Sequence, residues 1–265
     1  MSRQLLPVPA IPPGQPALRR LPRLLAGLRY DRPASLADHE RCHGPIPRHR
    51  PGSPGRPGRL SEGVERSGLT GRGGAGFPTG RKMRSVASRR GPAVVIANGA
   101  EGEPASGKDR LLLTRLPHLV LDGISLAAQA VGAREAHLVV HRQDGWLRDR
   151  LQAAADARYA AGTDPVPIQV TGIPGRYVSS EQTAVAAFLG GGPGKPAFTP
   201  PRLDERGLRG RPTLENNVET LAHLALIARY GDGWFRSIGL PSATGSALVT
   251  AGGTVGRPGI YEIEL

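Results

Sequence analysis

Cysteine is almost absent from this sequence, and long apolar runs are missing altogether. The single thiol, Cys42, excludes an intrachain disulfide framework and any zinc or iron–sulfur site built from four thiolates. No apolar stretch reaches the roughly 18–20 residues that span a bilayer, and the N-terminus lacks an apolar core with a small-residue cleavage site. We therefore expect a cytoplasmic chain, either free or peripheral to the inner face of the cell membrane, with no transmembrane segment, no metal site and no iron–sulfur cluster.

Aromatic residues make up only 4% of the chain, although its formal net charge is +13. Nucleic-acid binding would need basic residues interleaved with aromatic ones, and the sequence shows no such stripe. Much of the charge lies in residues 1–60, which hold 11 arginines against three acids and 12 of the 26 prolines. Such a segment can bury little, so we expect a poorly ordered basic tail or a strap over another surface, and no nucleic-acid partner.

Lysine and asparagine are also scarce, with three residues of each. Where a composition avoids a residue type, its few occurrences are candidates for specific chemistry. All six lie beside glycine-rich or helix-capping stretches: Lys82, Lys108, Lys195, Asn98, Asn216 and Asn217.

The middle of the chain alternates between strand and helix patterns. Three short runs rich in β-branched residues indicate buried strands, and two longer segments with helical patterns lie between them. The expected elements are, in order, 92–99 (strand), 117–131 (helix), 135–141 (strand), 145–162 (helix) and 166–172 (strand). This order predicts an α/β, Rossmann-like three-layer fold with a parallel sheet, flanking helices and ligands at the carboxyl ends of the strands.

Two further helices follow the third strand. Ser179 or Ser180 is expected to cap a helix over residues 181–189. Asn216 at the cap and Glu219 three residues later form a capping-box pattern in front of the last long helix.

The C-terminal residues 246–265 have the pattern of two strands around a glycine-rich turn. A two-stranded ribbon is marginal alone, so it either packs on the main domain or opens a further domain. We accordingly divide the chain into the tail (1–60), an α/β domain (61–240) and the ribbon (241–265).

The segment GRGGAGFPTG, residues 71–80, contains five glycines. Three of them fit the dinucleotide pattern G-x-G-x-x-G, but that pattern needs a strand before it and a helix after it. The preceding residues are polar, and Pro78 and Gly80 are expected to break any helix. We predict a flat glycine loop on which a planar or phosphorylated ligand lies against backbone N–H groups, with Lys82 reaching in. A purely structural glycine turn is the alternative.

Four separated motifs occur in a recognisable order: GRGGAGFPTG, NGAEGEPASGKDR, YVSSEQTA and RPTLENNVETLA. In this order they resemble the FMN-carrying, NADH-binding flavoprotein subunit of bacterial NADH-quinone oxidoreductase (complex I) and the related flavin subunits of NAD-reducing hydrogenases and formate dehydrogenases. The resemblance runs from about Ser67 to the C-terminus, where the ribbon resembles the start of the family's β-grasp domain.

The resemblance implies FMN as the cofactor and NADH as the substrate. Glu181 and Glu103 match acidic residues of the family and are the candidate catalytic residues. Phe77 matches a residue beside the nicotinamide, and Asn216 and Asn217 match the set around the FMN phosphate. The implied cofactor-binding residues are Gly71, Arg72, Gly73, Gly74, Ala75, Gly76, Phe77, Lys82, Asn98, Glu101, Tyr177, Asn216, Asn217 and Thr220.

Several of these polar residues also have purely structural interpretations. Asn216 could serve only as a helix cap, although helix N-termini also bind anions. Glu103 could be a solvated turn carboxylate, and Asp109 with Arg110 is expected to be a structural ion pair or cap. We expect three histidines on apolar patterns to lie in the core or at caps and assign them no catalysis: His118, His137 and His223.

The chain departs from the family around the flavin. Ala100 stands where the family has an aspartate, which removes one polar contact. Gln182 replaces the second glutamate of a pair, and Ser179-Ser180 replaces Cys-Gly. A neutral amide in place of a carboxylate beside a redox ring is expected to raise the flavin potential.

The nucleotide side departs further. Ser85 replaces an aromatic residue, and Thr199 and Arg202 replace the lysine and phenylalanine of the family's proline-rich loop. Since a base–aromatic stack contributes about 1–3 kcal/mol, losing both aromatics is expected to weaken dinucleotide affinity by a factor on the order of 100. The family's C-terminal helical bundle with four cluster-binding cysteines is absent from this sequence.

Two functions of different class follow. The first is an FMN-dependent oxidoreductase that takes a hydride from NAD(P)H and passes electrons to a partner subunit carrying iron–sulfur clusters. The second is a diverged flavin-binding or assembly module without NADH turnover. The replaced residues favour the module, whereas the retained Lys82, Asn98, Glu101 and Asn216-Asn217 favour the enzyme.

Overall fold

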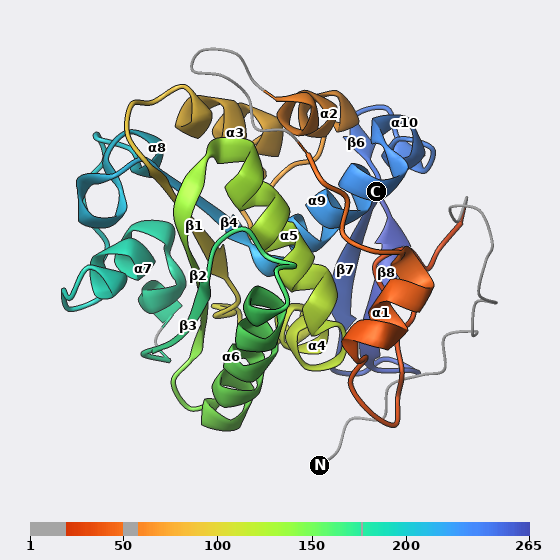
Figure 1. Ribbon diagram of the computed structural model, residues 1–265. Helices are drawn as coiled ribbons and strands as arrows, with labels where there is room; N and C mark the ends of the chain where they lie inside the picture. Colours follow the sequence, from red (N-terminus) through yellow and green to blue (C-terminus); the bar gives the residue numbers. More distant parts are fainter. Residues whose placement is uncertain (1–19, 50–57, 176) are drawn as a thin grey trace.

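A four-stranded parallel sheet forms the centre of the molecule (Figure 1). The computed structural model describes residues 20–49, 58–175 and 177–265. The strands are β1 (Ala93–Asn98), β2 (Ala133–His141), β3 (Ile168–Ile173) and β4 (Thr213–Asn217), in the order β3-β2-β1-β4. Each neighbouring pair is parallel, which confirms the predicted α/β fold.

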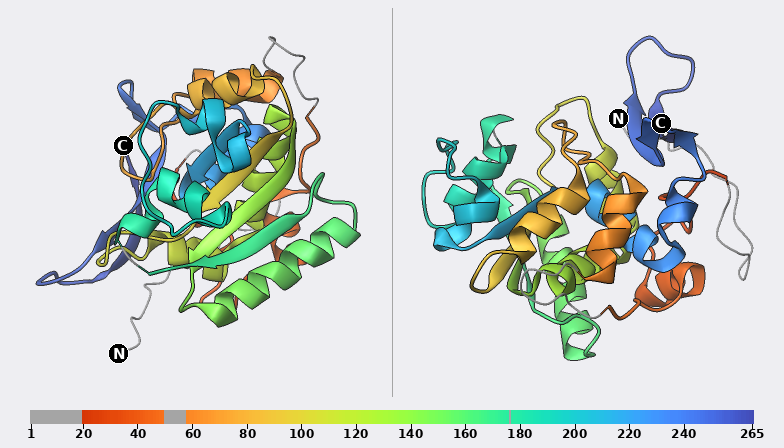
Figure 2. Two further views of the ribbon diagram at one scale, coloured as in Figure 1. Left: turned by 90° about the vertical axis from the view of Figure 1, so that its left-hand side faces the viewer. Right: turned by 90° about the horizontal axis from the view of Figure 1, so that it is seen from above.

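Helices cover both faces of the sheet, so the domain has three layers (Figure 2). One face packs against a large core formed with α2 (Arg59–Ser67), α3 (Thr79–Ala87), α4 (Lys108–Arg115), α5 (Pro117–Val131), α6 (Gly145–Ala160) and α9 (Val218–Tyr230). The other face packs against α7 (Gln182–Leu189) and α8 (Leu203–Arg206) through a smaller cluster that includes Ile96 and Val185.

Helix α5 is the central helix of the large core. Its bounds match the prediction, because Pro117 suits the first turn and Gly132 ends the helix in a left-handed conformation (φ 65°). Nearly every residue of α5 is buried. At Gly123 the helix approaches α9 so closely that a Cβ there would lie 2.1 Å from the carbonyl oxygen of Leu221.

Among the described residues, no single helix is long and apolar enough to cross a membrane. Helices α4 and α5 would meet that test only as a pair, and the chain bends by 97° between them.

Two predicted caps are wrong by one or two residues. Helix α7 is capped by Glu181, whose carboxylate accepts hydrogen bonds from Thr183 N (2.8 Å) and Ala184 N (3.1 Å), because Ser179 and Ser180 belong to a preceding 3₁₀ turn (Tyr177–Ser180).

The cap of α9 is Asn217, not Asn216. Asn216 still belongs to β4, where it pairs with Ala97, and Asn217 Oδ1 accepts from Glu219 N at 3.0 Å. Glu219 does not reach back to complete a capping box, since its Oε1 accepts instead from Leu248 N at 2.8 Å.

The expectation that Pro78 and Gly80 would break a helix is also wrong. Helix α3 begins directly after Pro78, a position where a missing N–H costs nothing. Gly80 lies in the first turn because α3 crosses α2 there: a Cβ at this position would lie 2.5 Å from Glu65 Cα. The glycine serves helix packing and does not end the helix.

The described part of the N-terminal segment, residues 20–49, packs on the domain, as a strap would; a tail or a strap was expected for residues 1–60. It carries α1 (Leu36–His43), and Leu24 and Leu25 are buried in the main core. A few apolar and histidine side chains anchor this segment, although it is otherwise basic and rich in proline. Residues 1–19 and 50–57 of the expected tail lie outside the described residues.

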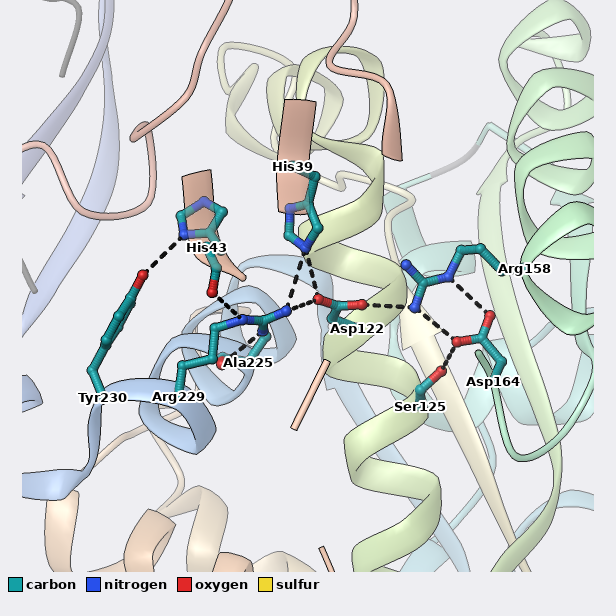
Figure 3. Close-up of polar contacts among 9 residues, drawn as sticks. All are labelled: His39, His43, Asp122, Ser125, Arg158, Asp164, Ala225, Arg229 and Tyr230. Atoms are coloured by element: carbon teal, nitrogen blue, oxygen red, sulfur yellow. Dashed lines mark hydrogen bonds and ion pairs between the residues drawn. The ribbon is translucent and has the colours of Figure 1, made fainter. Parts of the chain in front are cut away.

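A buried polar network connects this segment to the domain (Figure 3). His39 Nε2 of α1 lies 2.7 Å from Asp122 Oδ2 of α5, and Arg229 of α9 donates to the same oxygen. The second oxygen of Asp122 accepts from Arg158 Nη2 at 2.6 Å, and Arg158 also binds Asp164 with two nitrogens, at 2.8 and 3.0 Å. Burial works to raise the pKa of Asp122, but the hydrogen bond from His39 and the charges of Arg229 and Arg158 hold that pKa well below its ordinary value.

The predicted C-terminal ribbon is present as β7 (Ser246–Ala251) and β8 (Gly259–Glu264), an antiparallel pair on the side of the molecule opposite α7 and α8 (Figure 1). Leu248 joins the main core, so the ribbon packs on the domain. The carboxylate of Glu262 accepts hydrogen bonds from three consecutive backbone amides at Arg23, Leu24 and Leu25, at 2.7, 2.9 and 3.1 Å. The N-terminal segment thus holds the ribbon in place. Short pieces complete the chain: α10 (Asp232–Phe235), the 3₁₀ turn Leu208–Gly210, β5 (Gly239–Leu240) and β6 (Ala243–Thr244).

Candidate functional site

The strand order of the sheet reverses between β1 and β4. The chain proceeds from β1 through β2 to β3 on one side, whereas β4 is added on the other side. In parallel α/β sheets, ligands bind outside the carboxyl ends of the strands at such a reversal. Here the two strands end side by side with Asn98 opposite Asn217, as expected for residues predicted to share one site.

The glycine loop closes over these strand ends. Its base is fixed by hydrogen bonds from Gly71 N to Phe77 O and from Thr79 N to Leu69 O, both 2.9 Å. Gly74 and Gly76 have φ of 104° and 61°, conformations that favour glycine, and a Cβ at either would meet nothing within 4 Å. The outer surface of the loop is therefore open, and residues 73–77 are exposed.

The loop is attached to the first turn of α9. Arg72 N donates to Thr220 Oγ1 at 2.9 Å, and a Cβ at Gly73 would lie 3.4 Å from Asn217 Cβ. The Arg72 side chain turns toward the ribbon, where Nη2 donates to Ser246 O at 3.1 Å. The loop thus lies against Asn217 and Thr220, which are more than 130 residues away in sequence.

Asn217 is a centre of hydrogen bonds at the end of β4. Its Nδ2 donates to Asp109 Oδ2 at 2.6 Å and to Asn98 O at 3.3 Å, and its Oδ1 accepts from Lys108 Nζ at 3.1 Å as well as from the α9 backbone. Lys108 also pairs with Asp109 (2.6 Å) and Glu219 (3.0 Å). Sequence reasoning treated Asp109 as structural and did not identify this cluster, although the scarcity of lysine pointed to Lys108.

Asp109 is expected to give folding stability a pH dependence between about pH 4 and 6. Burial raises its pKa to about 6 even though Lys108 opposes the shift, whereas an unfolded aspartate titrates near 3.9. The folded state therefore binds more protons in this window, and its contribution to stability, complete below pH 4, is lost as the pH rises through 6. Urea unfolding at pH 4 to 7 measures the effect. As the pH rises, the free energy of unfolding of Asp109→Asn should increase relative to that of the wild type by roughly 2 kcal/mol. Parallel curves for the two proteins would contradict this.

The side chain of Lys82 extends from α3 to β4. Its Nζ lies 3.2 Å from Glu215 Oε2 and 3.5 Å from Gln182 Oε1, and it also donates to the backbone oxygen of Glu215. Asn98 Nδ2 donates to Glu215 Oε1 at 3.1 Å and to Ser180 O at 2.8 Å. The structure thus brings Lys82 and Asn98 together through Glu215, a residue that sequence reasoning did not single out.

The three predicted acidic residues have different surroundings. The carboxylate of Glu181 caps α7 through Thr183 and Ala184. Glu101 accepts from Ser106 Oγ, and its backbone oxygen from His141 Nε2 at 2.9 Å. Glu103 is exposed on the turn that follows β1. Within the described residues, its backbone oxygen accepts a hydrogen bond from Ser106 N, and no hydrogen bond joins it to another predicted site residue. The side chain of Tyr177 lies outside the described residues.

Two places where the sequence departs from the family pattern can be located in the structure. Ser85 Oγ donates to Asp204 Oδ2 at 2.5 Å, which ties α3 to α8 where an aromatic ring was expected. Phe198, next to Thr199 in the proline-rich loop, is 99% exposed.

The histidines to which we assigned no catalysis, His118, His137 and His223, are buried, as expected.

A glycine loop that is bonded to a helix N-terminus at the reversal of a parallel sheet is the arrangement found in nucleotide-binding α/β proteins. Comparison with known proteins identifies the family. The model of the Nuo51 FMN-binding domain matches residues 64–226. The chain therefore belongs to the Nuo51 FMN-binding domain family, which confirms the resemblance seen in the motifs.

Individual relatives agree with this assignment. An NADH-quinone oxidoreductase subunit of Aquifex aeolicus is 36% identical over 219 residues, or 79% of this chain and 51% of that protein. The alpha subunit of the NAD-reducing hydrogenase HoxS of Cupriavidus necator is 36% identical over 223 residues, or 79% of this chain and 36% of that protein. A crystal structure of an NAD⁺-reducing NiFe hydrogenase in the H₂-reduced state has a TM-score of 0.74 and 40% identity, covering 77% of this chain and 36% of that one. The chain thus spans about half the length of the Aquifex relative and less of the two hydrogenase chains.

Proposed function

We propose that this chain binds FMN in a crevice formed by the outer surface of the glycine loop, the ends of β1 and β4 and the N-terminus of α9, with NADH as the hydride donor. The observation that carries the proposal is the hydrogen bond from Arg72 N to Thr220 Oγ1, which holds the open loop beside a helix N-terminus at the reversal of the sheet. When bound, FMN supplies the capacity to accept a hydride and return electrons to an acceptor. The protein supplies binding, orientation and electrostatics.

The side chains present fit this cofactor. The first turn of α9, with Asn217 and Thr220, offers the helix N-terminus that favours an ester phosphate. Asn216 Nδ2, next to the cap, is a buried donor without a partner among the described residues. The open amides of residues 73–76 offer a flat surface for a ring, and Phe77, 48% exposed at the end of the loop, offers an apolar face for a nicotinamide.

The proposal also covers the donor, the acceptor and the candidate catalytic residues. We infer weaker binding of the dinucleotide than in the aromatic-bearing relatives, because Ser85 is committed to Asp204. Glu181 and Glu103 are proposed to act at the nicotinamide side. The named relatives are subunits of larger enzymes, which supports an electron-accepting partner subunit with iron–sulfur clusters. The ribbon (241–265) is proposed to open a β-grasp domain.

The proposal predicts that Lys82→Ala and Asn217→Ala each weaken FMN binding at least about tenfold. Lys82→Ala leaves the buried carboxylate of Glu215 unpaired beside an anionic ligand, and Asn217→Ala removes a hydrogen-bonding side chain at the N-terminus of α9. Each loss is worth about 1.5 kcal/mol or more, and 1.4 kcal/mol corresponds to a factor of ten. Quenching of FMN fluorescence on titration with purified protein measures the affinity. Anaerobic addition of NADH to the yellow complex then tests hydride transfer through bleaching of the flavin absorbance.

Lys195→Ala is the matched control, since Lys195 is exposed in the proline-rich loop, and its FMN affinity should equal that of the wild type. Unchanged affinity in both Lys82→Ala and Asn217→Ala would refute the site. A yellow protein that NADH does not bleach would support a flavin-binding protein with another donor, and a colourless protein that rejects FMN would support an assembly module.

A further inference from the structure

A buried carboxylate, that of Glu215, lies among the side chains of the proposed FMN site. Glu215 is the third residue of the edge strand β4, and 7% of the residue is exposed. Its two oxygens face different partners: Oε1 accepts from Asn98 Nδ2 at 3.1 Å, and Oε2 lies 3.2 Å from Lys82 Nζ. The carboxylate therefore connects the end of β1 with α3 beneath the crevice.

The arrangement fixes both the position and the effective charge of Lys82. Lysine has a long, flexible side chain, but here the ammonium also donates to the backbone oxygen of Glu215 and is thereby held to β4 at two points. A buried carboxylate is costly unless it is paired and hydrogen-bonded, and Lys82 and Asn98 meet both needs. The pair Lys82–Glu215 contributes no net charge to the crevice.

This neutrality matters for a redox ring. A lone ammonium beside a flavin would favour the reduced form, which carries more negative charge than the oxidised form. Lys82 Nζ also lies 3.5 Å from Gln182 Oε1, which belongs to a neutral amide. The higher flavin potential expected from the amide at Gln182 is therefore opposed by a carboxylate that reaches the same lysine from β4.

Building on the proposed function, we propose that Glu215 is a positioning residue that holds Lys82 in place and cancels its charge. Through Lys82 it lowers the preference of the site for reduced over oxidised FMN, and hence the two-electron potential of the bound cofactor.

A double-mutant cycle on the FMN-loaded protein tests this inference, with the potential of bound FMN measured by anaerobic reductive titration against a reference dye. Glu215→Gln keeps an acceptor for Asn98 but leaves the lysine unpaired, so the ratio of affinities for reduced and oxidised FMN should rise at least tenfold, about 30 mV for a two-electron couple. Lys82→Gln leaves the carboxylate and should lower the ratio. The double variant should return to within about threefold of the wild type, because it restores neutrality.

Glu205→Gln is the matched control, since Glu205 on α8 pairs with Arg89 at 3.0 Å and is 40% exposed; its ratio should not change. A ratio for Glu215→Gln within twofold of the wild type, or single variants that shift in the same direction, would overturn the inference, because a merely structural role gives no opposite signs. If Glu215→Gln retains no FMN, the double variant is compared with Lys82→Gln instead. The ratio of affinities for reduced and oxidised FMN must then be tenfold higher in the double variant, and equal ratios overturn the inference. Wild-type protein that rejects FMN overturns the proposed function and this inference with it, whereas FMN binding with unchanged ratios overturns the inference alone.

Discussion

Replacing Asp122 by asparagine should lower the free energy of unfolding by about 3–5 kcal/mol, the range for breaking a buried ion pair by removing one partner. Asp122 is 1% exposed and receives hydrogen bonds from Arg158, Arg229 and the ring of His39. Asparagine has nearly the same shape, but it removes the negative charge between two buried guanidinium groups. It also turns an N–H group toward a site already filled with donors, so at least one donor loses its partner.

Urea unfolding followed by circular dichroism at pH 7 measures the effect. The matched control is Asp149→Asn, because Asp149 pairs with Arg148 at 2.7 Å but is 68% exposed, and exposed pairs contribute about 0–1 kcal/mol. A loss for Asp122→Asn no greater than that of the control would mean that the network in Figure 3 contributes little to stability.

Replacing Gly123 by alanine is expected to destabilise the protein by about 3 kcal/mol or more, at or beyond the upper end of the usual cost of overpacking. The added Cβ would lie 2.1 Å from the carbonyl oxygen and 2.4 Å from the carbonyl carbon of Leu221. These are backbone atoms within α9, so no side-chain rotation relieves the contact. Helices α5 and α9 would have to separate, and both belong to the main core.

Gly63→Ala provides the contrast for this second substitution. Gly63 is also a buried helical glycine, in α2, but a Cβ there would meet only the far end of Arg66 at 3.8 Å. Alanine in a helix interior is favoured over glycine by about 0.5–1 kcal/mol, so this variant should be slightly more stable than the wild type. Melting temperatures compare the two, and equal melting temperatures would show that α5 and α9 tolerate a wider spacing.

The parts of the fold that the sequence predicts correctly are those controlled by local chemistry. The segments of helix α5 and strand β1 contain their own start and stop signals and their own apolar patterns. Their positions could therefore be derived without knowledge of the rest of the molecule. The cap of α9 depends on tertiary structure, because whether Asn216 or Asn217 caps the helix is decided by the pairing of β4 with β1. The start of α3 depends on the crossing with α2 that Gly80 permits.

The site shows the same division. The motif order suggested that the glycine loop and Asn217 would lie together, as they do, whereas Glu215 could not be distinguished by type from the other glutamates of the chain. Its one local signal is a charged residue within an otherwise apolar or uncharged strand, TLENN. The two partners of this charge, Lys82 and Asn98, are each more than 100 residues away in sequence. Only the tertiary fold brings them to the same strand end.

The hydrogen bonds from three backbone amides to Glu262 have a consequence for how the protein unfolds. A two-stranded ribbon has little stability of its own, so β7 and β8 persist through Leu248 and through the backbone near Leu25. The first and last stretches of the described chain are therefore interdependent. A backbone cleavage that frees residues 20–26 from the rest would remove one anchor of the C-terminal strands and leave the contacts of Leu248. The ribbon should then unfold at a lower temperature than in the intact protein.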